Sequence, residues 1–421
     1  MAFQTGLSGL NASSRSLDVI GNNIANANTT GMKTSRTEFG DMVLGSLSGA
    51  QSNNTGIGVY VATVSQQFSQ GSISTTGNNL DVAIDGSGFF QLTLPDKTTG
   101  YTRDGSFKLD KEGYIKTDSG AYVMGKPTDK AGLATGAVQK LQMPTNTRID
   151  PNPTTTVTAE FNLDARATPV DGVLASTGVA AIPATPRSTY GTSVNVYDKK
   201  GIPSPVNLYF EKNAIATPPT WDVFTSLDKT VQPSSSPIGT ITFDEFGKIS
   251  GPTATAPATG FGITLAGGTV TAITQDITLD LSNVTQFGSA FSVTNLTQDG
   301  YADGTLTNLS IGEDGIISAR YSNGQTQAAG QLTLTDFPNV QGLNPLGGNT
   351  WAETSASGAP TPAGTPGSGK FGTLRSGALE DSNVDLTAEL VNMMTAQRAY
   401  QANAQTIKTQ DQVMSTLVNL R

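Results

Sequence analysis

Acidic side chains that precede glycines are the residues of this chain whose spacing could bind a metal ion. Three segments, LDKEGY at 109–114, FDEFGK at 243–248 and GEDG at 312–315, each offer two acids beside a glycine. A calcium loop requires four or more oxygen ligands at set spacing, as in D-x-[DN]-x-[DN]-G. We therefore predict hairpin turns at these segments, and neither a metal nor a cofactor.

Composition removes much of the remaining enzymatic chemistry. The 421 residues include no Cys and no His, so thiolate nucleophiles, disulfides and the commonest general base are absent. Nothing singles out a catalytic pair among the 34 Asp and Glu residues. The GSG at 86–88 follows a predicted strand but opens no helix, so it does not indicate a phosphate-binding loop. We predict that the protein is not an enzyme and has no catalytic residues.

The charge pattern excludes several classes of partner. The net charge is −9, and no cluster of Lys and Arg exceeds a local pair, so we expect neither nucleic acid nor an anionic membrane as a partner. No apolar run of about 18 residues could span a bilayer. The first residues, MAFQTGLSGLNASS, lack the basic and apolar regions of a secretory signal. These features alone predict a cytoplasmic protein.

The first 29 residues predict a helix with one apolar stripe. Its members recur mainly at heptad spacing: Phe3, Leu7, Leu10, Leu17 and Ile24. Gly6, Gly9 and Gly21 each weaken such a helix by about 1 kcal/mol relative to Ala. We therefore expect this helix to order only beside a partner.

The last residues predict a longer helix that starts near Leu386, with Asp385 as its N-cap. The apolar stripe contains one row spaced by seven and an interleaved row: Leu386, Met393, Tyr400, Ile407 and Met414, then Leu390, Ala404 and Val418. We predict that the two terminal stripes pair as a coiled coil and serve assembly. The polar face carries few charges, and Gln401, Gln405, Gln412 and Asn419 are candidates to line a channel.

The residues between the helices alternate with a period of two and contain many turn signals, such as Asp104-Gly105. The predicted fold class is α+β and mainly β. We predict a helical domain from 1–29 and 378–421, and an extended connector at 30–70. A discontinuous β-rich domain follows at 71–145 and 304–377, with an outer β domain inserted at 146–303.

Both ends of the chain resemble one protein family. LDVIGNNIANANTTGMKTSRTEF at 17–39 and GALEDSNVDLTAELVNMMTAQRAYQANAQTIKTQDQVMSTLVNLR at 377–421 are similar to the terminal signatures of bacterial flagellar rod and hook proteins. The N-terminal motif is carried by Asn22, Asn23, Ala25, Asn26, Thr30, Gly31 and Lys33. The resemblance covers about the first 125 and the last 120 residues, and the insert at 146–303 favours a hook-type member over the shorter rod proteins.

The resemblance implies a function. Hook proteins form a homopolymer, a hollow curved tube that acts as a universal joint for motor torque. The partners it implies are the flagellar rod, the hook cap, the hook–filament junction and the export proteins. It also implies type III export without a cleaved signal, which replaces the cytoplasmic prediction by an extracellular one. The alternatives are a distal rod or other axial subunit, a β-rich surface adhesin, and a carboxylate-only hydrolase.

Overall fold

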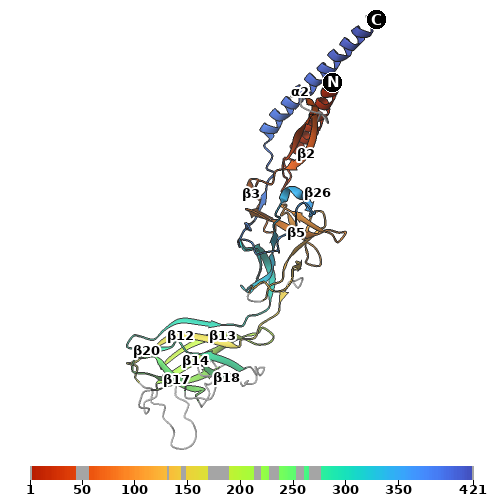
Figure 1. The fold of residues 1–421 in the computed structure, drawn as a ribbon. Helices are drawn as coiled ribbons and strands as arrows, with labels where there is room; N and C mark the ends of the chain where they lie inside the picture. The colour runs from red at the N-terminus through yellow and green to blue at the C-terminus, as the bar shows by residue number, and fades with distance from the viewer. Residues whose placement is uncertain are drawn as a thin grey trace, which may run out of the picture. The chain divides into compact units, whose positions relative to one another are not determined.

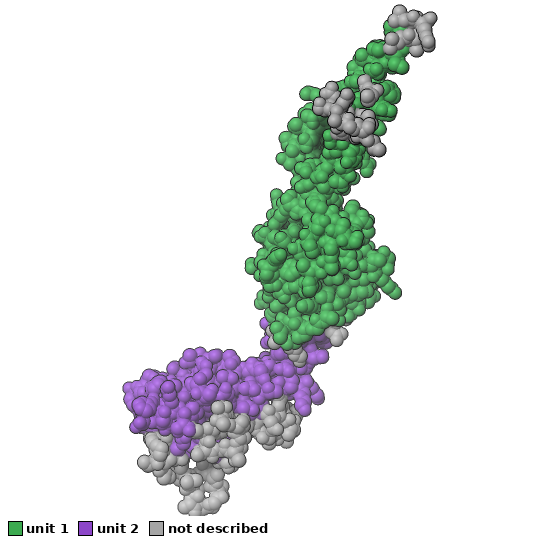
Figure 2. Space-filling view, viewed as in Figure 1, with its two compact units in different colours: residues 1–145, 307–320, 326–421 green, residues 146–306, 321–325 purple. Residues whose placement is uncertain are grey.

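A computed structural model describes residues 2–43, 56–129, 132–143, 148–168, 189–212, 220–226, 237–252, 260–264 and 276–419. The chain forms two compact units (Figure 2). Unit 1 comprises 1–145, 307–320 and 326–421, and unit 2 comprises 146–306 and 321–325. The predicted insert at 146–303 therefore falls within unit 2.

Two helices and a β-hairpin form one end of unit 1 (Figure 1). Helix α1 spans Ala2–Ala25, and α2 spans Leu386–Asn419. The Asp385 carboxylate caps α2 by accepting from the backbone N–H groups of Thr387 and Ala388, at 2.9 and 3.2 Å. The two helices lie side by side although they open and close the chain. No helix in the described ranges is long and apolar enough to cross a membrane.

The segment 30–70, predicted as an extended connector, contains a long antiparallel β-hairpin. Strand β1 (Ser35–Val43) pairs with β2 (Gly56–Gln66) from Ser35↔Gln66 to Val43↔Gly56. The prediction of a connector is wrong for these residues, because pairing satisfies their backbone hydrogen bonds. Gly40 lacks a side chain where the ring of Tyr60 crosses it, and a Cβ at this position would lie only 2.7 Å from the ring.

The β-rich part of unit 1 centres on one large sheet with the strand order β22-β23-β24-β9-β5-β6-β27-β26. Its elements are β3 (Ile73–Thr75), β4 (Val82–Asp85), β5 (Phe89–Thr93), β6 (Thr99–Thr102), β7 (Phe107–Leu109), β8 (Ile115–Thr117), β9 (Tyr122–Lys126), β10 (Gln139–Lys140), β22 (Gly304–Ile311), β23 (Ile316–Tyr321), β24 (Thr326–Leu332), β25 (Leu334–Thr335), η1 (Val340–Gly342), β26 (Asn344–Gly347), β27 (Thr350–Ala352), β28 (Thr373–Ser376) and β29 (Ala378–Glu380). Strand β28 pairs with β4 and β29 with β3, so the segment before α2 returns to the strands that follow the hairpin.

Acidic turns close several of these hairpins. The Asp110 carboxylate accepts from the N–H groups of Glu112 and Tyr114 between β7 and β8. In unit 2, Asp244 does the same for Phe246 and Lys248. The carboxylates are therefore used within their own turns. Among the described residues, no group of three or more acids is placed to hold a metal ion.

The described residues of unit 2 form two five-stranded sheets around one apolar core. Its elements are β11 (Arg148–Ile149), β12 (Thr156–Asp164), β13 (Tyr190–Tyr197), β14 (Pro203–Lys212), β15 (Thr220–Ser226), β16 (Gly239–Phe243), β17 (Ile249–Pro252), β18 (Gly260–Thr264), β19 (Asp276–Asp280), β20 (Thr285–Phe287) and β21 (Ser292–Gln298). Strands β13 to β17 form a meander, and β12 is central in the other sheet. Phe161 and Phe210 meet across the core with ring centroids 4.5 Å apart. The predicted class, mainly β with helices at both ends, is confirmed.

Candidate assembly interface

Glycines form the face of α1 that meets α2. A Cβ on Gly6 would lie 3.1 Å from Ile407 Cγ1, and one on Gly9 would lie 2.8 Å from Asn403 Nδ2. Asn403 also donates to Ser13 Oγ at 3.5 Å. Gly6 and Gly9, two of the three glycines that weaken the isolated helix, therefore allow the two helices to approach closely.

The predicted N-terminal stripe lies beside this contact face rather than on it. Phe3 and Leu7 are 49% and 44% exposed, whereas Leu10, Leu17 and Ile24 are half-buried. The prediction that the stripe packs on α2 is wrong for Phe3 and Leu7. The physical reason is that Gly6 follows Phe3 by three residues, so the contact face is turned by about 60° round the helix.

The predicted C-terminal stripe is partly covered in one row and shifted in the other. Met393 and Ile407 are half-buried, and Tyr400 is 37% exposed. The ends of the row, Leu386 and Met414, are exposed.

In the interleaved row, the partly covered positions are Glu389, Ala396, Asn403 and Gln410. Leu390 is 52% exposed, so the predicted row begins one residue too late, although Ala404 is half-buried. The prediction of this row followed the apolar residues, whereas the polar residues Glu389 and Asn403 make the contacts to α1. The side chain of Val418 lies outside the described residues.

The face of α2 turned away from α1 changes character along its length. Leu390, Val391 and Met394 leave an apolar ridge exposed near the start of the helix. The channel-lining candidates Gln401, Gln405 and Gln412 follow and are all exposed. The side chain of Asn419 lies outside the described residues. Their role in a channel stays a prediction.

A groove separates the two helices and the hairpin. Its volume is about 750 Å³, and small side chains of both helices line it, among them Ala12, Ser16, Ala396 and Ala399. Phe39 and Val59 of the hairpin form its wall. The helices of one copy therefore do not fill the space between them.

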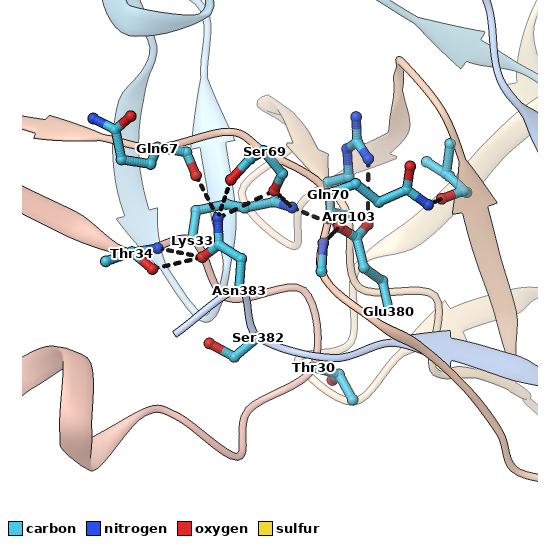
Figure 3. A network of polar contacts seen from close by, with 12 residues as sticks. Thr30, Lys33, Thr34, Gln67, Ser69, Gln70, Arg103, Glu380, Ser382 and Asn383 are labelled. Atoms are coloured by element: carbon cyan, nitrogen blue, oxygen red, sulfur yellow. Dashed lines mark hydrogen bonds and ion pairs between the residues drawn. The ribbon is translucent and has the colours of Figure 1, made fainter. Parts of the chain in front are cut away.

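A polar cluster with a buried centre lies where both helices join the β-rich part of unit 1 (Figure 3). We call it the hub and define it as Lys33, Thr34, Ser69, Arg103, Glu380 and Asn383. Lys33 Nζ lies 2.6 Å from Glu380 Oε1 and donates to the Ser69 carbonyl at 2.8 Å. Arg103 Nη1 lies 3.3 Å from Glu380 Oε2. Lys33 and Glu380 are fully buried, and this burial lowers the pKa of Lys33 despite the attraction of Glu380.

The amide of Asn383 joins three segments of the chain. Its Oδ1 accepts from the N–H and the hydroxyl of Thr34, both at 2.7 Å. Its Nδ2 donates to the carbonyls of Gln67 and Ser69, at 2.8 and 3.1 Å (Figure 3). The exit from α1, the end of the hairpin and the entry to α2 are therefore held at one point.

The remaining motif residues surround the hub. Asn23 is buried and exchanges two hydrogen bonds with the backbone of Ser35, while Asn26 Nδ2 donates to the Asn22 carbonyl at 2.9 Å. Ala25 ends α1, and the Thr30 carbonyl accepts from Asn349 Nδ2 at 2.6 Å.

Gly31 has a φ of 68°, and its N–H donates to the Glu380 carbonyl at 2.8 Å. A Cβ there would lie 2.7 Å from the backbone nitrogen of Asp104. Only glycine fits this approach without strain.

Sequence reasoning missed Arg103, Glu380 and Asn383. Glu380 and Asn383 lie in the C-terminal signature. The available signal was the charge of Glu380, because the chain contains few charged residues. Nothing in the sequence pairs Glu380 with Lys33, because 347 positions separate them.

Comparison with known proteins assigns this arrangement to a family. The chain is 39% identical to the flagellar hook protein FlgE of Salmonella typhimurium, with both chains covered completely. It is also 39% identical to that of Escherichia coli over the same full extent, and 34% identical to that of Treponema pallidum over 99% of this chain and 98% of the relative. The chain belongs to the flagellar hook protein family.

Four models of flagellar protein families match parts of this hook-family chain. The flagella basal body rod protein model matches 3–33, and the flagellar hook protein FlgE/F/G D1 domain model matches 83–159. The flagellar basal body protein FlaE D2 domain model matches 162–301, and the flagellar basal body rod FlgEFG protein C-terminal model matches 375–420. Lys33 closes the first of these segments and Glu380 lies in the last, so the two terminal segments meet in the hub.

A solved structure shares the fold. The crystal structure of Helicobacter pylori flagellar hook protein FlgE2 aligns with a TM-score of 0.54 at 17% identity, and covers 73% of this chain and all of that chain. This likeness concerns the fold alone.

Proposed function

We propose that this hook-family protein is a structural subunit that self-assembles into the hollow, curved hook of a bacterial flagellum and has no catalytic activity. The observation that carries the proposal is the full-length identity to flagellar hook proteins. In this role the polymer is a universal joint that transmits torque from the rod to the filament.

The terminal helices supply a surface suited to polymerisation. Leu390, Val391 and Met394 are each about half exposed, which leaves an apolar ridge in contact with water. Full burial of such a side chain contributes roughly 1.5–3 kcal/mol. Burial of the ridge against neighbouring copies therefore offers a driving force for assembly, and the unfilled groove supports the same conclusion.

The division of roles follows the chain. The helix pair builds the inner tube, with Gln401, Gln405, Gln412 and Asn419 toward the channel. An uncharged amide surface suits a channel because it does not bind the charged segments of a chain that passes through. The hairpin of β1 and β2 and the discontinuous β domain form a middle layer, and the inserted domain at 146–303 forms the outer one. The assembly residues of the two stripes, from Phe3 to Ile24 and from Leu386 to Val418, hold the subunits of the tube together.

The location and partners belong to the same proposal. The protein is exported by the flagellar type III system without a cleaved signal and lies outside the cell in the hook. Its partners are further copies of itself, the rod, the hook cap, the hook–filament junction and the export proteins.

Electron microscopy of isolated hooks tests the function. The gene is expressed in a strain that lacks its own hook protein and its filament, and curved tubes are expected. Leu386→Lys, Met393→Lys and Tyr400→Lys should each abolish tubes while circular dichroism retains the β signal. Leu133→Lys is the matched control, since Leu133 is 67% exposed in the β-rich part of unit 1.

Two outcomes would contradict the proposal. Normal hooks from all three stripe variants would show that the helix pair does not build the tube. Deletion of 146–303 should spare the tube and alter its curvature, so complete loss of polymer would contradict the outer position of that domain.

A further inference from the structure

Two apolar patches remain exposed on the helix pair. On α1, Phe3 and Leu7 are 49% and 44% exposed, and on α2, Leu390 and Met394 are both 52% exposed. The members of each pair are four residues apart, which places them on one face of their helix. We call the first pair the α1 patch and the second the α2 patch. Each patch has apolar surface left to bury against a partner.

The patches lie toward opposite ends of the helix pair. The helices are antiparallel, since Gly6 lies against Ile407 whereas Glu389 accepts from Asn23 Nδ2 at 3.4 Å. The α2 patch is therefore level with about residue 20 of α1, about 15 residues or 22 Å from the centre of the α1 patch. Across this distance the two patches of one copy cannot touch.

The patches match each other in spacing. If a second copy in the same orientation is displaced along the helix axis by about 22 Å, its α2 patch comes level with the α1 patch of the first copy. Because the facing helices are then antiparallel, Phe3 meets Met394 and Leu7 meets Leu390. The equal four-residue spacing allows both contacts to form at once.

The charges of the helices favour the same displacement. Arg15 is exposed about two turns after Leu7, and it forms no ion pair among the described residues. Within one copy it is level with Arg398, which has the same charge. In the displaced arrangement it comes level, to within about one turn, with Asp385 at the start of α2. An acidic neighbour thus replaces a basic one.

We propose that the α1 patch of one copy binds the α2 patch of a second copy that is displaced by about 22 Å along the helix axis. The inference rests on the proposed function, because it concerns copies within the polymer, and it does not require ordered helices in the free chain. Two unlike surfaces meet, so each copy binds one neighbour through each patch. A contact of this kind continues from copy to copy and builds a helical polymer rather than a closed dimer.

Cysteine pairs in isolated tubes test the contact, because the protein has no Cys of its own. Leu7→Cys with Leu390→Cys reports the proposed displacement. Leu7→Cys with Gln405→Cys reports copies at the same level, and Leu7→Cys with Gln397→Cys reports a displacement of about 12 Å. Both glutamines are exposed. The tubes are oxidised with copper phenanthroline, and denaturing gels without reductant measure the fraction of chain in covalent multimers.

The pair with Leu390→Cys should form at least about tenfold more multimer than either other pair, since a disulfide requires Cα atoms within about 7 Å. Leu7→Cys alone and Leu390→Cys alone are the matched controls and should form none. The proposal is overturned if another pair dominates, if either single variant gives dimers, or if tubes form and the pair with Leu390→Cys gives no multimer.

An exchange of charges decides the matter if that cysteine pair prevents assembly. Leu7→Lys and Leu390→Glu should each abolish tubes, and the double variant should restore them, because opposite charges then meet at one contact. Leu7→Lys with Gln405→Glu is the control and should restore nothing. Tubes from either single variant, or none from the double variant, would overturn the contact. Absence of tubes from the native chain would instead contradict the proposed function, so the two failures are distinguishable.

Discussion

Replacement of Glu380 by Gln should destabilise unit 1 far more than its small change in shape implies. The carboxylate receives Lys33 Nζ at 2.6 Å, Arg103 Nη1 at 3.3 Å and the Gly71 N–H at 2.9 Å. Gln keeps one acceptor oxygen and turns the other position into a donor that faces donors. Two buried cations then lose their counter-charge. Removal of one partner from a buried ion pair costs about 3–5 kcal/mol, and we expect that loss in the free energy of unfolding.

Urea denaturation followed by Trp351 fluorescence measures this loss. Trp351 lies in the aromatic core of unit 1, and its Nε1 donates to Gln66 Oε1 at 2.6 Å. All variants carry Trp221→Phe so that unit 2 is silent, and the Trp221 Nε1 has no hydrogen-bond partner among the described residues to lose. With a slope of about 2 kcal/mol per molar urea, the midpoint should fall by about 2 M.

Asp381→Asn is the matched control for the neighbouring position. Asp381 is exposed and accepts from the Ser74 hydroxyl at 3.0 Å, so its midpoint should move by less than about 0.3 M. Equal midpoints for Glu380→Gln and Asp381→Asn would refute the reasoning, because the buried charges would then have no measurable effect on stability.

Three further predictions follow from local geometry. Gly31→Ala should lower the free energy of unfolding measured in urea by about 1–2 kcal/mol or more, because of the φ of 68° at Gly31 and its contact with Asp104. Gly21 lies in open space on α1, so Gly21→Ala should increase the helicity measured by circular dichroism. Asp110 is hydrogen-bonded by Lys116, which lowers its pKa to about 2. Because this folded-state pKa lies below the unfolded value of about 3.9, its stabilisation is present above pH 4 and is lost as the pH falls to 2. The stability difference between the native chain and Asp110→Asn should therefore shrink over that range, and a constant difference would contradict it. Phe210→Ala should lower the free energy of unfolding of unit 2 by about 3–5 kcal/mol, because Phe210 is part of its core. By calorimetry, the transition of unit 2 should move to lower temperature and that of unit 1 should not move.

Much of the architecture could be predicted from local signals in the sequence. Asp385 and the uninterrupted pattern after it predicted α2, and the start at Leu386 is confirmed. The absence of Cys and His narrowed the chemistry before any fold was known. The two terminal signatures indicated the family, which the full-length relatives confirm. Each of these signals is contained in a short segment, so one sequence suffices to show it.

The contacts between distant segments were decided only by the tertiary structure. Periodicity shows which side of a helix is apolar but does not show its partner, and the contact face of α1 is formed by Gly6 and Gly9 rather than by Phe3 and Leu7. The pairing of β1 with β2 depends on a register that no single strand reveals. The hub joins Lys33 to Glu380 across almost the whole chain. A buried ion pair requires complementary charges at one place in space, and only the folded chain determines which residues meet there.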